Sequence, residues 1–189
     1  MYQRLLGEVR FHQLLLKFDE DLAARTREGG CPRCAGTLHW ARYPRKPRGG
    51  PASLREQYSQ RASFCCAVAG CRRRITPASL RFLGRRVYLA TVVVLASAMR
   101  CGLTPQRVSR LARELSVPRR TLERWREWWR TAFVHSPFWK AAAGRFMPPV
   151  TLAALPGSLL ERFRAADRAG RVLALLRFLS PLSTIGHGR

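Results

Sequence analysis

Two cysteine-bearing turns constrain the fold of this chain more than any other feature of its sequence. Cys31 and Cys34 enclose a Pro-Arg dipeptide, and a second group further along contains Cys65, Cys66 and Cys71. Pairs of cysteines on tight turns are typical of structural zinc sites, where two such turns supply four tetrahedral ligands. Four thiolates leave no coordination position for water, so we expect one structural Zn²⁺ rather than a catalytic ion.

The second turn offers three cysteines, so the third ligand is either Cys65 or Cys66. In a strand, a core aromatic two residues before a ligand shares its face, and Phe64 stands in that relation to Cys66. The predicted metal ligands are therefore Cys31, Cys34, Cys66 and Cys71. Cys65 is then a packed or spare thiol. Two alternatives stay open: His39 replaces one cysteine, or the first pair is a redox C-x-x-C motif, although no thioredoxin-like βαβ pattern surrounds it.

Residues 103–130 predict two short helices joined by a tight turn. Thr104 and Pro105 open the first helix, because a hydroxyl caps free N–H groups and proline already has a helical φ. Apolar residues recur at helical spacing in both halves: Val108, Leu111, Ala112 and Leu115, then Leu122, Trp125 and Trp129. The outward positions of the second helix include three arginines: Arg119, Arg120 and Arg124.

This pair resembles the helix-turn-helix of DNA-binding regulators and transposases. The resemblance is carried by the spacing of five residues: Ala112, Leu115, Val117, Leu122 and Trp125. Ser116 and Pro118 replace the glycine and the capping serine that are usual in that turn. The cysteine turns, followed by three arginines, resemble the zinc ribbons that precede helix-turn-helix modules in insertion-sequence transposases. Over residues 31–130 the resemblance implies a mainly α chain with a small β zinc ribbon, followed by a helix-turn-helix domain. A helical hairpin with a solvated, arginine-rich face is the alternative.

The charge balance favours a polyanionic partner. The chain carries 35 Lys+Arg against 11 Asp+Glu, a net charge of +24, and electrostatic attraction supplies much of nucleic-acid binding. The resemblance implies that the second helix enters the major groove of double-stranded DNA with Arg119, Arg120, Thr121 and Arg124. It also implies backbone contacts from Arg72, Arg73 and Arg74, and from Arg45, Lys46 and Arg48. The last three lie in the Pro- and Gly-rich loop 42–51, which we expect to be irregular.

Further helices are predicted on both sides of these motifs. They cover residues 2–27, 77–83, 85–99, 158–169 and 171–179. Asp19 is expected on the polar side of the first helix, and His12 as an ordinary surface or packing residue. The last helix is apolar enough to need a partner, either in the chain's own core or in another protein. The predicted domains are an N-terminal helix (1–30), the zinc ribbon (31–76), a helical domain (77–147) and C-terminal helices (148–189).

The acidic residues argue against an enzyme. An RNase H-type site needs three carboxylates on a mixed sheet to hold two magnesium ions, whereas the 11 acids fall mostly on predicted helix surfaces or ends. The longest apolar run, residues 87–99, is well short of the roughly 20 residues that cross a bilayer. We therefore expect no catalytic residue and no membrane segment.

The sequence predicts a non-catalytic protein that contains zinc and binds double-stranded DNA. By resemblance, it serves a mobile genetic element as an accessory or regulatory factor in transposition, DNA recombination or transcription, on the nucleoid in the bacterial cytoplasm. One alternative is an RNA-binding subunit of a ribonucleoprotein. Another is a scaffold whose C-terminal helices recruit a transposase, a recombinase or an ATPase.

Overall fold

The chain folds mainly into helices, with a small β part. The computed structural model describes residues 3–45, 47–51, 53–54, 56–84, 88–98, 106 and 117–184. The α-helices are α1 (Gln3–Gly7), α2 (Val9–Glu28), α3 (Ala90–Ser97), α5 (Arg119–Trp128), α6 (Pro137–Ala142), α7 (Gly157–Leu160) and α8 (Arg168–Leu179). The strands are β1 (Leu38–Trp40), β2 (Tyr43–Pro44), β3 (Gln60–Arg61), β4 (Phe64–Cys66) and β5 (Arg74–Ile75). The predicted class, mainly α with a small β part, is confirmed.

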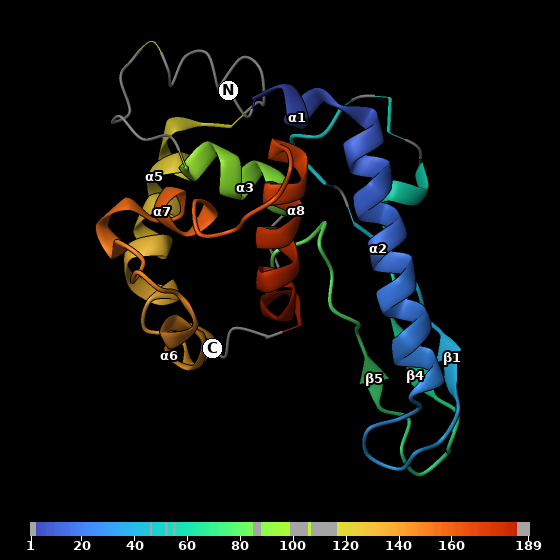
Figure 1. Cartoon of the computed structure of the whole chain (residues 1–189). Helices are drawn as coiled ribbons and strands as arrows, with labels where there is room; N and C mark the ends of the chain where they lie inside the picture. Colours follow the sequence, from blue (N-terminus) through green and yellow to red (C-terminus); the bar gives the residue numbers. More distant parts are fainter. Residues whose placement is uncertain are drawn as a thin grey trace.

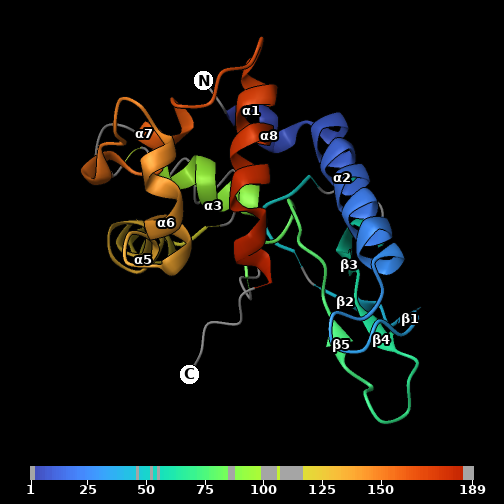
Figure 2. The ribbon, with the colours of Figure 1, turned by 60° about the horizontal axis from the view of Figure 1, so that its bottom comes forward.

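Two hydrophobic cores lie along α2. The larger core takes side chains from α1, α2, α3 and α5 to α8, and we call this part the helical body. The smaller core joins Ala23 of α2 to the sheet and the cysteine turns. We call residues 31–76 the cysteine module; its sheet lies beside the C-terminal half of α2 (Figure 1). In both Figure 1 and Figure 2, α8 lies between α2 and the group formed by α5, α6 and α7.

The first predicted helix is broken into two. Glu8 has an extended backbone (φ −84°, ψ 104°), so α1 and α2 are separate. The end of α2 falls where the two glycines predict it: Gly30 takes a left-handed φ of +70°, which other residues rarely adopt. Leu15 is fully buried and Leu14 is exposed, so Leu15 lies on the face of α2 that packs against the core.

The cysteine module is built on a three-stranded antiparallel sheet with the order β1-β4-β5. Leu38 pairs with Cys66 and Trp40 pairs with Phe64, so these four residues share one face of the sheet. The Leu38, Phe64 and Cys66 side chains are buried against α2. The prediction of an irregular loop over residues 42–51 is partly wrong, because β2 pairs with β3. Pro44 is tolerated there because β2 is a short strand in a two-stranded sheet.

The hydrophobic helix predicted over residues 85–99 is shorter in the structure. It begins only at Ala90, because Leu89 has an extended backbone and makes an isolated antiparallel bridge with Phe82. All eight residues of α3 are buried, so this helix forms the centre of the helical body. Residues 85–87 and 99 lie outside the described residues.

The helix predicted from Thr76 and Pro77 is wrong. Residues 76–79 have no regular structure, and the Leu80 N–H, which would bond to the Thr76 carbonyl in such a helix, binds the buried carboxylate of Asp19 instead. The Leu80 N–H donates to Asp19 Oδ1 at 2.6 Å, and the Ser79 hydroxyl also donates to this carboxylate. Arg81 Nε forms an ion pair with Asp19 Oδ2 at 2.8 Å. Asp19 is therefore not on the polar side of its helix, as expected from the sequence, but ties α2 to this segment.

His12 is also buried, in a polar contact between α2 and the turn before β3. Its Nε2 lies 3.1 Å from the Leu6 carbonyl oxygen, which only accepts, so Nε2 carries the proton and donates. Nδ1 is then an acceptor, and the Tyr58 hydroxyl donates to it at 3.0 Å. Burial raises the pKa of Tyr58, which keeps this hydroxyl protonated.

We expect the free energy of unfolding to fall as the pH drops below 6.5, in part through His12. Burial is the largest cause that lowers the pKa of His12 from 6.5, and the Leu6 carbonyl and Glu8 carboxylate oppose it only in part. Below pH 6.5 the unfolded chain binds more protons than the folded one, so stability is lost toward the lowered folded-state pKa. Urea unfolding near neutrality and at about pH 5.5 measures this loss. His12→Gln, which does not titrate, should weaken the pH dependence; an unchanged dependence would contradict the assignment.

The C-terminal segment belongs to the helical body. The predicted helix over residues 158–169 is only the short α7, whereas α8 covers all of residues 171–179, as predicted, and begins three residues earlier. Asp167 caps α8 by accepting from the Gly170 N–H at 2.7 Å. The apolar side chains of α8 enter the larger core, including Val172, Leu175, Leu176 and Leu179. This helix therefore finds its partner within the chain.

Candidate metal centre and basic surface

The first pair of cysteines sits on a turn that directly follows α2. The Cys31 N–H donates to the Gly36 carbonyl at 2.9 Å, and the Ala35 N–H donates back to the Cys31 carbonyl at 2.8 Å. A Cβ at Gly36 would lie 2.6 Å from Val68 Cγ2 and 3.2 Å from Cys66 Sγ. A larger residue here would therefore have to displace Val68 or a cysteine sulfur where the two turns meet.

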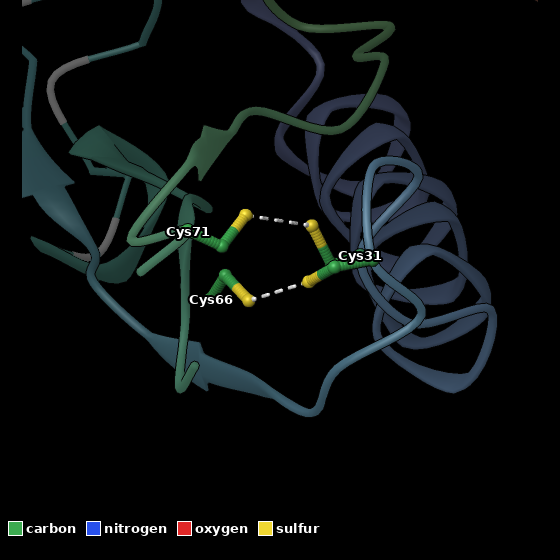
Figure 3. Close-up of side chains that lie close together, drawn as sticks. Cys31, Cys66 and Cys71 are labelled. Atoms are coloured by element: carbon green, nitrogen blue, oxygen red, sulfur yellow. Dashed lines mark hydrogen bonds between the residues drawn. The ribbon is translucent and has the colours of Figure 1, made fainter. Parts of the chain in front are cut away.

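The four predicted cysteines come together at one point. The Sγ atoms of Cys31, Cys34, Cys66 and Cys71 all lie within 4.8 Å of one another. Cys31 and Cys71 are 3.7 Å apart and Cys34 and Cys66 are 3.4 Å apart, measured between sulfurs. Figure 3 shows the thiols of Cys66 and Cys71 pointing toward the turn that carries Cys31. A tetrahedral ion with Zn–S bonds of about 2.3 Å separates its sulfurs by about 3.8 Å, so the cluster fits a metal of this size.

Cys65 lies outside this cluster. Its Sγ lies 3.6 Å from the Arg72 carbonyl oxygen and 3.7 Å from that of Cys66. Cys66 and Phe64 are fully buried on the face of β4 that meets α2, whereas Cys65 is half-buried on the other face. His39 pairs with Cys65 and is exposed, so it too lies outside the metal-binding group found among the described residues.

The thiols of the cluster differ in acidity. The backbone N–H of Arg33 is the largest cause that lowers the pKa of Cys31 to about 6, with smaller contributions from Cys34 and Cys71. Burial raises the pKa of Cys66 to about 12. Cys31 therefore loses its proton more readily than Cys66, and each thiol must be deprotonated to ligate a cation.

A metal ion held by the four clustered cysteines would determine which thiols react with an alkylating reagent. In a Cys101→Ser background, which removes the cysteine outside the described residues, we expect Cys65 to be modified while the four clustered cysteines are protected by metal. Chelation should then expose the remaining four. Mass spectrometry of tryptic peptides before and after chelation measures this, and protection of Cys65 together with reaction of Cys34 would contradict the ligand set.

The predicted DNA-reading helix is present as α5. Val117, Leu122, Trp125 and Trp129 are buried against the helical body, and Arg119, Arg120 and Arg124 are exposed. Arg119 pairs with Glu123 at 2.8 Å on this exposed face. Thr121, which is also among the predicted contacts, is 8% exposed, and Arg124 Nη2 donates to its hydroxyl at 3.4 Å. The first predicted helix of the pair, residues 103–116, lies outside the described residues except for Gln106.

The other predicted contacts are distributed over the cysteine module. Arg72, Arg73 and Arg74 are all exposed, after the second cysteine turn. Arg48 is exposed, and its backbone bridges to Tyr88. Arg45 is half-buried, and its guanidinium lies 5.2 Å from the ring centre of Phe82. Lys46 lies outside the described residues.

Comparisons with protein-family models, curated proteins and solved structures found no match for this chain. Among the described residues, no helix is both long and apolar enough to span a membrane.

Proposed function

We propose that this chain is a non-catalytic protein that binds double-stranded DNA through a zinc ribbon and a helix-turn-helix. The observation that carries the proposal is the two-sided character of α5. Thr121, Leu122 and Trp125 bury one side of this helix, while three arginines project from the other. Arginine side chains in that position can donate two parallel hydrogen bonds to a guanine edge or a phosphate.

The cysteine module supports the same proposal. Cys31, Cys34, Cys66 and Cys71 would hold one Zn²⁺, whose chemistry here is to cross-link the two turns. This would fix the exposed arginines at 72, 73 and 74 beside a rigid sheet, where they can bind the phosphate backbone. That the protein serves a mobile element, as an accessory or regulatory factor, rests on its resemblance to transposase modules.

The alternatives are less well supported. The scaffold alternative relied on an unpaired apolar helix near the C-terminus, but α8 packs into the chain's own core. The net charge of +24 favours binding of RNA as much as binding of DNA. A direct competition between the two nucleic acids is therefore needed to separate the RNA alternative from the proposed function.

The decisive experiment captures nucleic acid from a mixture of fragmented source genome and total RNA at near-physiological salt. We expect the recovered duplex fragments to share a sequence motif, because α5 reads base edges. Replacing Arg119, Arg120 and Arg124 together with alanine should abolish enrichment of the motif. The matched control replaces three exposed cations of α2, Arg10, Lys17 and Arg25, which changes the net charge equally.

Two outcomes would overturn the proposal. Recovery of RNA in preference to duplex DNA would favour the ribonucleoprotein alternative. Recovery of duplex DNA without a motif, or equal losses in the α5 and α2 variants, would show that only net charge drives binding.

A further inference from the structure

Trp40 and Arg42 form a stacked pair at the edge of the cysteine module. The Arg42 guanidinium carbon lies 4.3 Å from the centre of the indole ring, closer than any other described pairing of an arginine with an aromatic ring. Tryptophan is also the aromatic side chain that attracts cations most strongly. The indole also packs on Phe64, with ring centres 4.6 Å apart.

The backbone on both sides of Arg42 is fixed by pairing. Trp40 pairs with Phe64 in one sheet, and the Ala41 N–H donates to the Ser63 carbonyl at 2.8 Å. Directly after Arg42, Tyr43 pairs with Arg61 in the other sheet. A side chain whose backbone and stacking partner are both fixed loses little freedom when it binds a ligand.

The pair is nevertheless open to solvent. Trp40 is 43% exposed, although Phe64 beneath it is fully buried, and Arg42 is exposed. Among the described residues, Arg42 has no carboxylate partner, unlike Arg81 and Arg119. The stacked guanidinium therefore keeps its N–H groups available to an anion.

We propose that Arg42, held by Trp40, is a phosphate contact for the backbone of double-stranded DNA. Trp40 acts as a positioning residue, because stacking fixes the planar guanidinium whose edge binds a phosphate through parallel hydrogen bonds. The chain's large positive charge favours a polyanion as the occupant. This inference rests on the proposed function. It adds a contact from the cysteine module that would fix the position of the duplex along the protein.

The test measures duplex affinity as a function of salt, with the full chain and a DNA fragment recovered in the capture experiment. Each phosphate contact contributes about 0.9 to the slope of log affinity against log salt, so Arg42→Ala should lower the slope by about 0.9 and weaken binding about fivefold at about 0.15 M salt. The control Arg10→Ala removes the same charge from α2 and should leave the slope unchanged. Trp40→Leu should weaken binding about two- to fivefold, and Trp40→Phe should restore part of the loss.

A double variant separates positioning from direct contact. If Trp40 acts through Arg42, adding Trp40→Leu to Arg42→Ala should cause no further loss of affinity. An equal loss from Trp40→Leu in both backgrounds would overturn the positioning role. If the slope of log affinity against log salt is the same for Arg42→Ala and Arg10→Ala, Arg42 does not contact a phosphate. That result would leave the proposed recognition of a DNA motif by α5 unaffected. If the wild-type chain binds no duplex, the proposed function itself fails.

Discussion

Replacing Cys34 with serine should remove the bound metal and unfold the cysteine module, whereas replacing Cys65 should do neither. Cys34 is exposed, so the substitution changes little packing and its effect reports on ligation. Among the described residues, the small core of the module has five buried members, Ala23, Cys31, Leu38, Phe64 and Cys66, which is little apolar surface for an independent fold. Structural zinc binding contributes about 10–16 kcal/mol in small zinc domains at neutral pH, so its loss should be decisive here.

Two measurements check this expectation. Elemental analysis should find one zinc per chain in the wild-type protein and in Cys65→Ser, and none in Cys34→Ser. Hydrogen exchange should show protected amides at Ala41 and Cys66, which donate to the carbonyls of Ser63 and Arg73, only when zinc is bound. Metal-free wild-type protein with the same protection, or loss of zinc from Cys65→Ser, would refute the ligand set.

Replacing Asp19 with asparagine should destabilise the whole chain by about 3–5 kcal/mol. Asp19 and Arg81 are each 3% exposed, so the substitution leaves a buried guanidinium without its countercharge. The asparagine amide would also place a donor beside Ser79 and Arg81, which both donate to the carboxylate of Asp19. Arg81 further donates to the carbonyls of Tyr58 and Gln60, so its displacement would disturb the start of β3.

The control is two residues away on the same helix. Asp21 is exposed, and Asp21→Asn removes the same charge without burying an unpaired group. We expect this control to change the free energy of unfolding by no more than about 0.5 kcal/mol. Urea unfolding of both variants at neutral pH makes the comparison, and similar losses in the two variants would show that Asp19 acts only through net charge.

Features governed by local periodicity were predictable from the sequence. The parity of Phe64 and Cys66 along a strand separated the clustered cysteine from Cys65, and the structure brings together the four predicted thiols. Helical spacing likewise assigned the buried and exposed sides of α5. In both cases the relevant residues lie within one element, where the repeat of the backbone decides which side chains share a face.

Features governed by distant polar partners were not predictable. Thr76 and Pro77 are a good local start for a helix, but Asp19, far away in the sequence, binds Leu80 and Ser79 and prevents it. His12 looked like an isolated residue because its partner, Tyr58, lies in another element. Neither contact leaves a periodic pattern, since a single carboxylate or imidazole on an apolar helix face resembles an ordinary polar interruption.

The length of α2 also determines how the cysteine module is oriented relative to the helical body. Phe11 and Leu15 anchor this helix in the helical body, and Ala23 anchors it in the small core of the cysteine module. Because an α-helix turns about 100° and rises about 1.5 Å per residue, one residue inserted between Leu15 and Ala23 would rotate the module by more than a quarter turn. Seven inserted residues would nearly restore its orientation while moving it about 10 Å outward. The number of residues between Leu15 and Ala23 therefore sets the direction in which the cysteine module points, and Asp19, which lies between them, holds the same spacing through its contacts with Leu80 and Arg81.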